Sequence, residues 1–283
     1  MTVVIPAPAA SLLLVRDGPQ GLEVLMVMRS EALDFAGGMT VFPGGRVDRR
    51  DSCHGGCAPF MARRGDHAYR IAALRELFEE TGLLLGRRRG GAYRLLGERD
   101  REAIARRYRR RVLKGEADFV RLLARVGLTL AAERLVPFSH WITPTPAPKR
   151  FDTRFFLAAA PPGQRASSDG RENIGLAWRR PQDLLGAWAE GRQRLMFPTR
   201  LNLMKLAASD TVASAIAHAR TTPVIPVTPE IHEGGVRRLV IPAEAGFGVT
   251  EASHDDLDPI ERGKALARLG QSGIAVERAA SRG

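Results

Sequence analysis

The sequence predicts an α/β fold, in which strands and helices share one hydrophobic core. Residues 10–15 and 22–28 are apolar runs joined by Asp17-Gly18-Pro19-Gln20-Gly21, a pattern typical of a β-hairpin with a five-residue turn. Residues 66–81 instead repeat apolar side chains at helical spacing, and Gly82 suits the left-handed residue that ends a helix. The chain of 283 residues is 44% hydrophobic, enough for one large domain or a core domain with an extension.

Three glutamates crowd the end of this predicted helix. Glu79 and Glu80 follow Glu76 by three and four residues, so the carboxylates are neighbours, on the face opposite the apolar stripe. Like charges at this spacing repel, and acids in a last turn oppose the helix dipole. A solvated acidic surface is the simplest interpretation. The alternative is a site for Mg²⁺ or Mn²⁺, because these cations take hard oxygen ligands.

The flanking residues favour the metal site. Phe42-Pro43-Gly44-Gly45 predicts a tight turn upstream, and Arg75 directly precedes the acids. Together these residues resemble the box of the Nudix hydrolases. That pattern reads Gly, five residues, Glu, seven residues, then Arg-Glu-apolar-x-Glu-Glu-x-Gly-apolar. The residues from Arg75 to Leu83 match every fixed position of its second half.

The first half of the box departs from that pattern. Asp51 occupies the position expected for Glu after Gly45, and 23 residues instead of seven separate it from Arg75. An insert over about residues 52–67 therefore splits the box. A split box of this kind is similar to the Nudix subgroup that includes the mammalian peroxisomal coenzyme A diphosphatase.

The insert contains residues that metals also bind. Cys53, His54 and Cys57 lie close together in the chain, with His67 nearby. A structural zinc site needs four ligands at suitable spacing, so reduced cysteines in a loop are the simpler interpretation.

Composition narrows the function classes. The net charge of +12 comes almost entirely from arginine, and aromatic residues are few, so nucleic-acid binding is not favoured. The sequence contains no run of 18 apolar residues, no basic and apolar leader and no C-terminal peroxisomal address. We therefore expect a cytoplasmic protein that does not span a membrane.

The remaining elements are predicted from period and turn residues. Further strands are expected at residues 39–42, 83–85, 135–143, 151–158 and 174–178, and a pair of strands at 223–227 and 236–241. Helices are expected at residues 100–113, 116–126 and 199–219, with a start near 180–183 and a short helix at 259–269. The arginines at 106, 107 and 109–111 form either a solvated cationic face or a surface for a phosphate-bearing substrate.

The resemblance implies a Nudix-type α/β/α sandwich with a mixed sheet. It also implies a Nudix domain over residues 1–200, which contains a helical insertion at about residues 98–128. Residues 201–283 would form a C-terminal extension, and for its last 40 or so residues a dimer arm, a lid and an unstructured tail are open alternatives. A homodimer is one of these alternatives.

The resemblance further implies roles for the box residues and a Mg²⁺ or Mn²⁺ cofactor. The implied metal ligands are Glu76, Glu79, Glu80 and a backbone carbonyl of Gly44 or Gly45. Arg75 would pair with an acid, expected to be Asp51, and hold it in place. One of Glu76, Glu79 or Glu172 would accept the proton of the attacking water. The implied reaction is hydrolysis of a pyrophosphate bond in a nucleoside diphosphate joined to another group.

Several residues are candidates for binding that small-molecule substrate. Arg29-Ser30 and Gly38 match a pattern of the coenzyme A branch, although Asp34 stands where its middle Arg is expected. Arg150 and Arg154 are candidates for pairing with phosphate, and Trp141 either stacks on a base or packs in the core. Coenzyme A and acyl-coenzyme A lead ADP-ribose, NADH and dinucleoside polyphosphates as substrates. The rival class is a non-catalytic nucleotide sensor, and the absence of a Gly-x-Ser-x-Gly elbow disfavours a metal-independent hydrolase.

Overall fold

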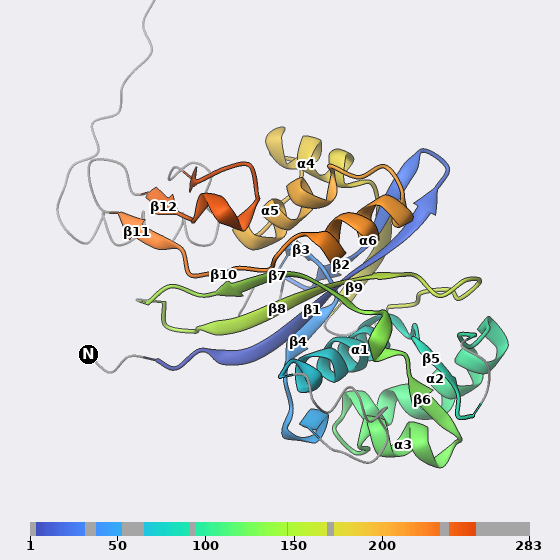
Figure 1. Ribbon diagram of the computed structural model, residues 1–283. Coiled ribbons are helices and arrows are strands. Elements are labelled where there is room, and N and C mark those ends of the chain that lie inside the picture. The colour runs from blue at the N-terminus through green and yellow to red at the C-terminus, as the bar shows by residue number, and fades with distance from the viewer. Residues whose placement is uncertain are drawn as a thin grey trace, which may run out of the picture.

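The computed structural model describes residues 4–31, 38–52, 65–90, 94–145, 147–168, 173–232 and 238–252. A mixed sheet lies between two groups of helices, with α1, α2 and α3 on one side and α4, α5 and α6 on the other (Figure 1). The predicted α/β/α sandwich is therefore confirmed. No helix of the described ranges is long and apolar enough to cross a bilayer.

The described helices have the following bounds: α1 (His67–Thr81), α2 (Glu98–Leu113), α3 (Phe119–Arg125), α4 (Pro181–Ala189), α5 (Phe197–Leu206) and α6 (Val212–Thr221). The strands of the main sheet are β1 (Ala7–Gly18), β2 (Gly21–Arg29), β3 (Thr40–Val41), β4 (Gly44–Arg46), β7 (Val136–Ile142), β8 (Phe151–Ala159), β9 (Asn173–Arg179) and β10 (Pro226–Val227). Two smaller sheets are formed by β5 (Gly86–Arg88) with β6 (Leu128–Leu130), and by β11 (Glu230–His232), β12 (Arg238–Val240) and β13 (Glu251–Ala252).

Strand β1 is the centre of the main sheet. The order is β10-β7-β8-β1-β2-β3, with β4 also paired to β1 and β9 to β2. The β1–β8 and β7–β10 pairs are parallel and the other pairs are antiparallel. Leu12 and Leu14 belong to the core on the α1 side, whereas Leu13 and Val15 belong to the core on the α5 side. Because both faces of β1 are covered, its sequence is a continuous apolar run rather than an alternating one.

Helix α1 is covered on two sides. Ile71, Leu74 and Leu77 are buried in the core that α1 shares with β1 and β8. Phe78 stacks on Phe119 of α3, with ring centroids 5.3 Å apart. The α2–α3 insertion therefore packs against the helix that carries the box. The bounds of α2 and α3 lie close to the predicted ranges of residues 100–113 and 116–126.

Of the elements predicted near the box, the β1–β2 hairpin forms with a shorter turn and one expected strand does not form. The β1–β2 hairpin is confirmed, although its turn has two residues rather than five because Gly18 pairs with Gly21. Residues 83–85 are not a strand. The side chain of Gln164 accepts from Leu84 N and donates to Leu84 O, at 2.9 and 3.0 Å, and so satisfies the backbone as a strand would.

Two predictions beyond residue 198 are wrong. The single helix expected over residues 199–219 is two helices, because Thr211 caps α6 by accepting a hydrogen bond from the backbone NH of Ser214. The strand pair expected from residues 223–227 and 236–241 does not form. Instead β10 pairs with β7, and β12 pairs with β11 and β13.

The end of the expected Nudix domain at residue 200 falls within α5, where Leu201 and Leu203 are fully buried. The short helix expected at residues 259–269 lies outside the described residues.

Candidate active site

The box helix begins and ends where its sequence indicates. Asp66 precedes α1 as its N-cap residue, and Gly82 follows it with a φ of 69°, in the left-handed region that favours glycine. The backbone NH of Gly82 donates to Phe78 O at 2.9 Å. These ends fix which turn carries each box residue.

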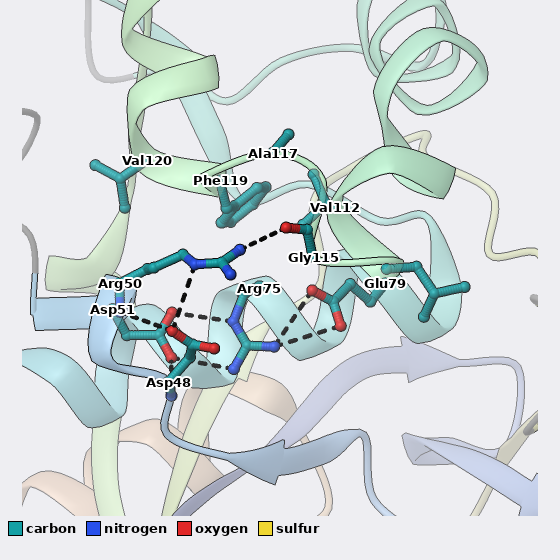
Figure 2. A pocket seen from close by; sticks show the side chains of 11 residues that line it. Asp48, Arg50, Asp51, Arg75, Glu79, Val112, Gly115, Ala117, Phe119 and Val120 are labelled. Carbon is teal, nitrogen blue, oxygen red and sulfur yellow. Dashed lines mark hydrogen bonds and ion pairs between the residues drawn. The ribbon is translucent and has the colours of Figure 1, made fainter.

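Arg75 and Asp51 form a two-pronged ion pair across the split in the box. Arg75 Nε lies 3.0 Å from Asp51 Oδ1, and Arg75 Nη2 lies 3.0 Å from Asp51 Oδ2 (Figure 2). The Asp51 side chain is 2% exposed, and its Oδ2 also accepts from the backbone NH of Asp48. The predicted pairing is confirmed, and aspartate is long enough for it.

The same guanidinium also contacts two glutamates of the box. Arg75 Nη1 lies 2.8 Å from Glu76 Oε1 and 3.2 Å from Glu79 Oε1. The fourth acid, Glu80, is placed by other groups. Its Oε2 accepts from the backbone NH of Gly44 at 3.1 Å, and it is hydrogen-bonded to the side chain of Asn173.

Gly45 allows the Glu76 carboxylate to approach the backbone. A Cβ atom at this position would lie 2.4 Å from Glu76 Oε1 and 2.5 Å from its Cδ. No side chain fits there unless Glu76 moves, so this glycine is needed for space. The Glu76 carboxylate therefore lies directly against the backbone at Gly45.

The acids are buried rather than solvated. Glu79 is 7% and Glu80 is 5% exposed, so the solvated acidic surface is wrong as an interpretation. Burial, and then the charge of Glu76, raises the pKa of Glu79 to about 7 and that of Glu80 to about 8. Burial opposes the charge of Arg75, but Asp51 and the glutamates raise its pKa overall.

The donor set suits a hard divalent cation. Three carboxylates, of Asp51, Glu76 and Glu79, contact one guanidinium, and Glu80 lies beside them; burial and the charge of Glu76 raise the pKa values of Glu79 and Glu80, so a bound cation would stabilise their charged forms. In the described ranges no group of three or more His, Cys, Asp or Glu side chains is already arranged around one point. Arg75 Nη1 contacts both Glu76 and Glu79 in this arrangement.

A cavity of about 140 Å³ opens beside these groups (Figure 2). One wall is charged and contains Asp51, Arg75 and Glu79. The opposite wall is supplied by the insertion and includes Val112, Phe119 and Val120. Ligand pockets usually exceed about 300 Å³, whereas one water takes about 30 Å³ of liquid volume. The cavity therefore has room for a hydrated ion or a few waters but not for a nucleotide.

The predicted substrate residues are not all near the box. The positive charge of Arg29 acts on Glu80, and its backbone is paired with Asn173. Arg150 donates to the carbonyls of Thr143 and Val4 and so fixes the end of the β7–β8 hairpin. Arg29 therefore lies near the box acids, whereas Arg150 pairs with backbone carbonyls of the fold.

Arg154 and Trp141 also lie in structural settings. Arg154 donates to Gly65 O at 3.2 Å and covers the ring of Tyr69 at 4.1 Å. Trp141 is 3% exposed and packs against Phe197 and Phe247, with centroids 5.9 and 5.0 Å apart. Of the two alternatives for Trp141, the structure shows core packing, so its proposed contact with a substrate base is not supported.

Some predicted residues lie outside the described part of the chain, and one contact was not predicted. Glu172, Cys53, His54 and Cys57 fall in segments that the structure does not describe. The contact of Asn173 with Glu80 was missed because an asparagine at the start of a strand carries no distinctive pattern. Only the pairing of β9 with β2 brings it beside the box.

Comparison with known proteins agrees with this geometry. A family model described as the NUDT19 Nudix domain matches residues 61–206, slightly more than half of the chain. The chain is 31% identical over 215 residues to the acyl-coenzyme A diphosphatase NUDT19 of Gallus gallus, covering 59% of this chain and 56% of that protein. It is 29% identical over 208 residues to the Homo sapiens protein of the same name, covering 58% and 55%.

The chain thus spans about half the length of the curated relatives it matches. The crystal structure of a Nudix hydrolase from Alicyclobacillus acidocaldarius superposes with a TM-score of 0.59 at 29% identity, covering 76% of this chain and 96% of that one. The chain belongs to the Nudix hydrolase family, in the branch that the NUDT19 Nudix domain describes.

Proposed function

We propose that this protein is a Mg²⁺- or Mn²⁺-dependent diphosphatase that acts on a nucleoside diphosphate joined to another group. The observation that carries the proposal is a cluster of four acids, of which Asp51, Glu79 and Glu80 are buried, with one arginine paired to Asp51, Glu76 and Glu79, because such a cluster has more negative than positive charge. Coenzyme A or acyl-coenzyme A is the leading substrate. The split box, Arg29-Ser30 and the names of the relatives support that choice.

Glu76, Glu79, Glu80 and the Gly45 carbonyl would hold the cation. When bound, a divalent ion offsets the charge of the diphosphate and acidifies a coordinated water. In the proposed reaction the water oxygen bonds to one phosphorus, the bridging P–O bond breaks, and two phosphate monoesters leave. We assign acceptance of the water proton to Glu79, because its carboxylate lines the cavity.

Two further residues support this arrangement. Asp51 holds Arg75 through both carboxylate oxygens, and Arg75 in turn orients Glu76 and Glu79. Arg29 lies close enough to influence Glu80, so we propose it as the contact for a substrate phosphate. We also propose that the Nudix domain continues past residue 200, because β10 is part of its main sheet, and that the extension follows β10.

A substrate panel tests the proposal. The full chain would be incubated with coenzyme A, acetyl-coenzyme A, ADP-ribose, NADH and diadenosine tetraphosphate, each with Mg²⁺ and with Mn²⁺. We expect adenosine 3′,5′-bisphosphate to be released from coenzyme A by the wild type and not by Glu80→Gln. A preference for ADP-ribose would overturn coenzyme A as the proposed substrate. Nucleotide binding without hydrolysis of any of these diphosphates would overturn the proposed enzyme and favour a non-catalytic nucleotide sensor.

A further inference from the structure

The last turn of α1 places negative charge at an unfavourable end of a helix. It carries Glu79 and Glu80, and it contains no basic residue. The free carbonyls at a helix C-terminus already carry partial negative charge, so the turn needs a cation from elsewhere.

Arg109 of the insertion supplies that cation. Its Nε donates to the carbonyl of Glu79 at 2.8 Å, and its Nη1 donates to Ser167 Oγ at 3.0 Å. The backbone NH of Ser167 donates in turn to Thr81 O at 2.8 Å. One guanidinium thereby joins the end of α1, the helix α2 and the segment that leads to β9.

The junction is tightly packed. A Cβ atom added at Gly82 would lie 3.2 Å from both Arg109 Nη1 and Ser167 Oγ, so these groups close over the end of the helix. Arg101 of α2 is also buried and would lie 3.6 Å from that Cβ atom, but its side chain pairs with Glu98, whereas Arg106, Arg110 and Arg111 are exposed to solvent. Within this basic helix, Arg109 therefore has a role that residue type alone does not indicate.

We propose that Arg109 is a positioning residue, which fixes the last turn of α1 and so the geometry of Glu79 and Glu80. The proposal rests on the proposed function, in which these glutamates hold the cation. The reason for the proposal is geometric. Arg109 donates to the backbone carbonyl of Glu79, so a displacement of this turn would move the carboxylates of Glu79 and Glu80 together. Misplacements of about 1 Å cost on the order of 10²-fold in rate.

The test compares Arg109→Ala and Arg109→Lys with Arg110→Ala, an exposed neighbour on the same helix. Three quantities would be measured: Mn²⁺ affinity by electron paramagnetic resonance, hydrogen exchange of the amides at the end of α1, and kcat and KM on the preferred diphosphate. For Arg109→Ala we expect about tenfold weaker Mn²⁺ binding, faster exchange, and kcat lowered about 10- to 100-fold. KM should stay within about threefold. Arg109→Lys keeps the charge without the fork and should recover part of the loss.

The outcomes separate the two proposals. Equal Mn²⁺ affinity and exchange in Arg109→Ala and Arg110→Ala would overturn the positioning role. If the wild type hydrolyses no diphosphate, yet Arg109→Ala still weakens Mn²⁺ binding and loosens the turn, the enzyme proposal fails and the positioning role stands. Should Arg109→Ala not fold, Ser167→Ala decides, because it removes one arm of the junction and should show a smaller change of the same sign.

Discussion

An added methyl group should affect different properties at the two adjacent glycines of the box, stability at Gly44 and activity at Gly45. A Cβ atom at Gly44 would lie 2.5 Å from the carbonyl oxygen of Ala10 and 2.8 Å from Ser11 Cα, both in the backbone of β1. A Cβ atom at Gly45 would meet only the carboxylate end of Glu76 as its nearest neighbours, at 2.4–2.8 Å. Backbone in a central strand cannot retreat, whereas a side-chain end can rotate.

The expected magnitudes follow from those contacts. Gly44→Ala must shift a paired strand, and overpacking of this kind costs about 1–3 kcal/mol. At about 2–4 °C per kcal/mol for a domain of this size, the melting temperature should fall by about 2–12 °C. Gly45→Ala needs a retreat of about 1 Å by the Glu76 carboxylate, for which an off-rotamer side chain costs about 1 kcal/mol. A misplacement of that size in the site should lower the rate on the order of 10²-fold.

Both variants would be followed by thermal melting and by Mn²⁺-dependent hydrolysis of the preferred diphosphate. We expect Gly44→Ala to lose stability and Gly45→Ala to lose activity at nearly wild-type stability. A control at Gly65, where an added Cβ meets no atom within 4 Å, should leave both properties unchanged. Wild-type turnover in Gly45→Ala would refute the reasoning that Glu76 must approach this backbone.

Three other predictions concern the acids. The double variant Glu79→Gln/Glu80→Gln should fold and lose nearly all metal-dependent hydrolysis, and retained turnover would contradict the proposed ligands. Asp51→Asn should lower the free energy of unfolding by about 3 kcal/mol, because it removes the charged partner of a buried Arg75, whereas the half-exposed Asp48→Asn should change it by less than about 1 kcal/mol in denaturant titrations. The raised pKa values of Glu79 and Glu80 mean that the metal-free folded state binds more protons than the unfolded state between about pH 4.5 and 8. The melting temperature should therefore fall as pH rises through that window and fall less in the double glutamine variant; equal slopes would show that these acids are not responsible.

Local patterns were sufficient where the cause is local. Gly82 marks the end of α1 because a C-cap in the left-handed region depends on that residue itself, whereas Asp66 precedes the first turn without a side-chain capping hydrogen bond. The Asp51–Arg75 pair was predictable from the family pattern, since the two residues pair although 23 residues separate them in the sequence. The capping box of Thr211 with Ser214 is local as well, but the prediction of one helix over residues 199–219 rested on periodicity and missed it.

Only the tertiary structure decided the burial of the acids and the residues that contact them. Periodicity places Glu79 and Glu80 opposite the apolar stripe of the helix, which ordinarily means solvent. They are buried because β4 and the α2–α3 insertion cover that face as well, and the covering segments lie about 30 residues away in the chain on either side. Likewise, the contacts of Asn173 and Arg109 arise from strand pairing and helix docking. A sequence specifies such long-range contacts only through the whole fold, because no short stretch contains both partners.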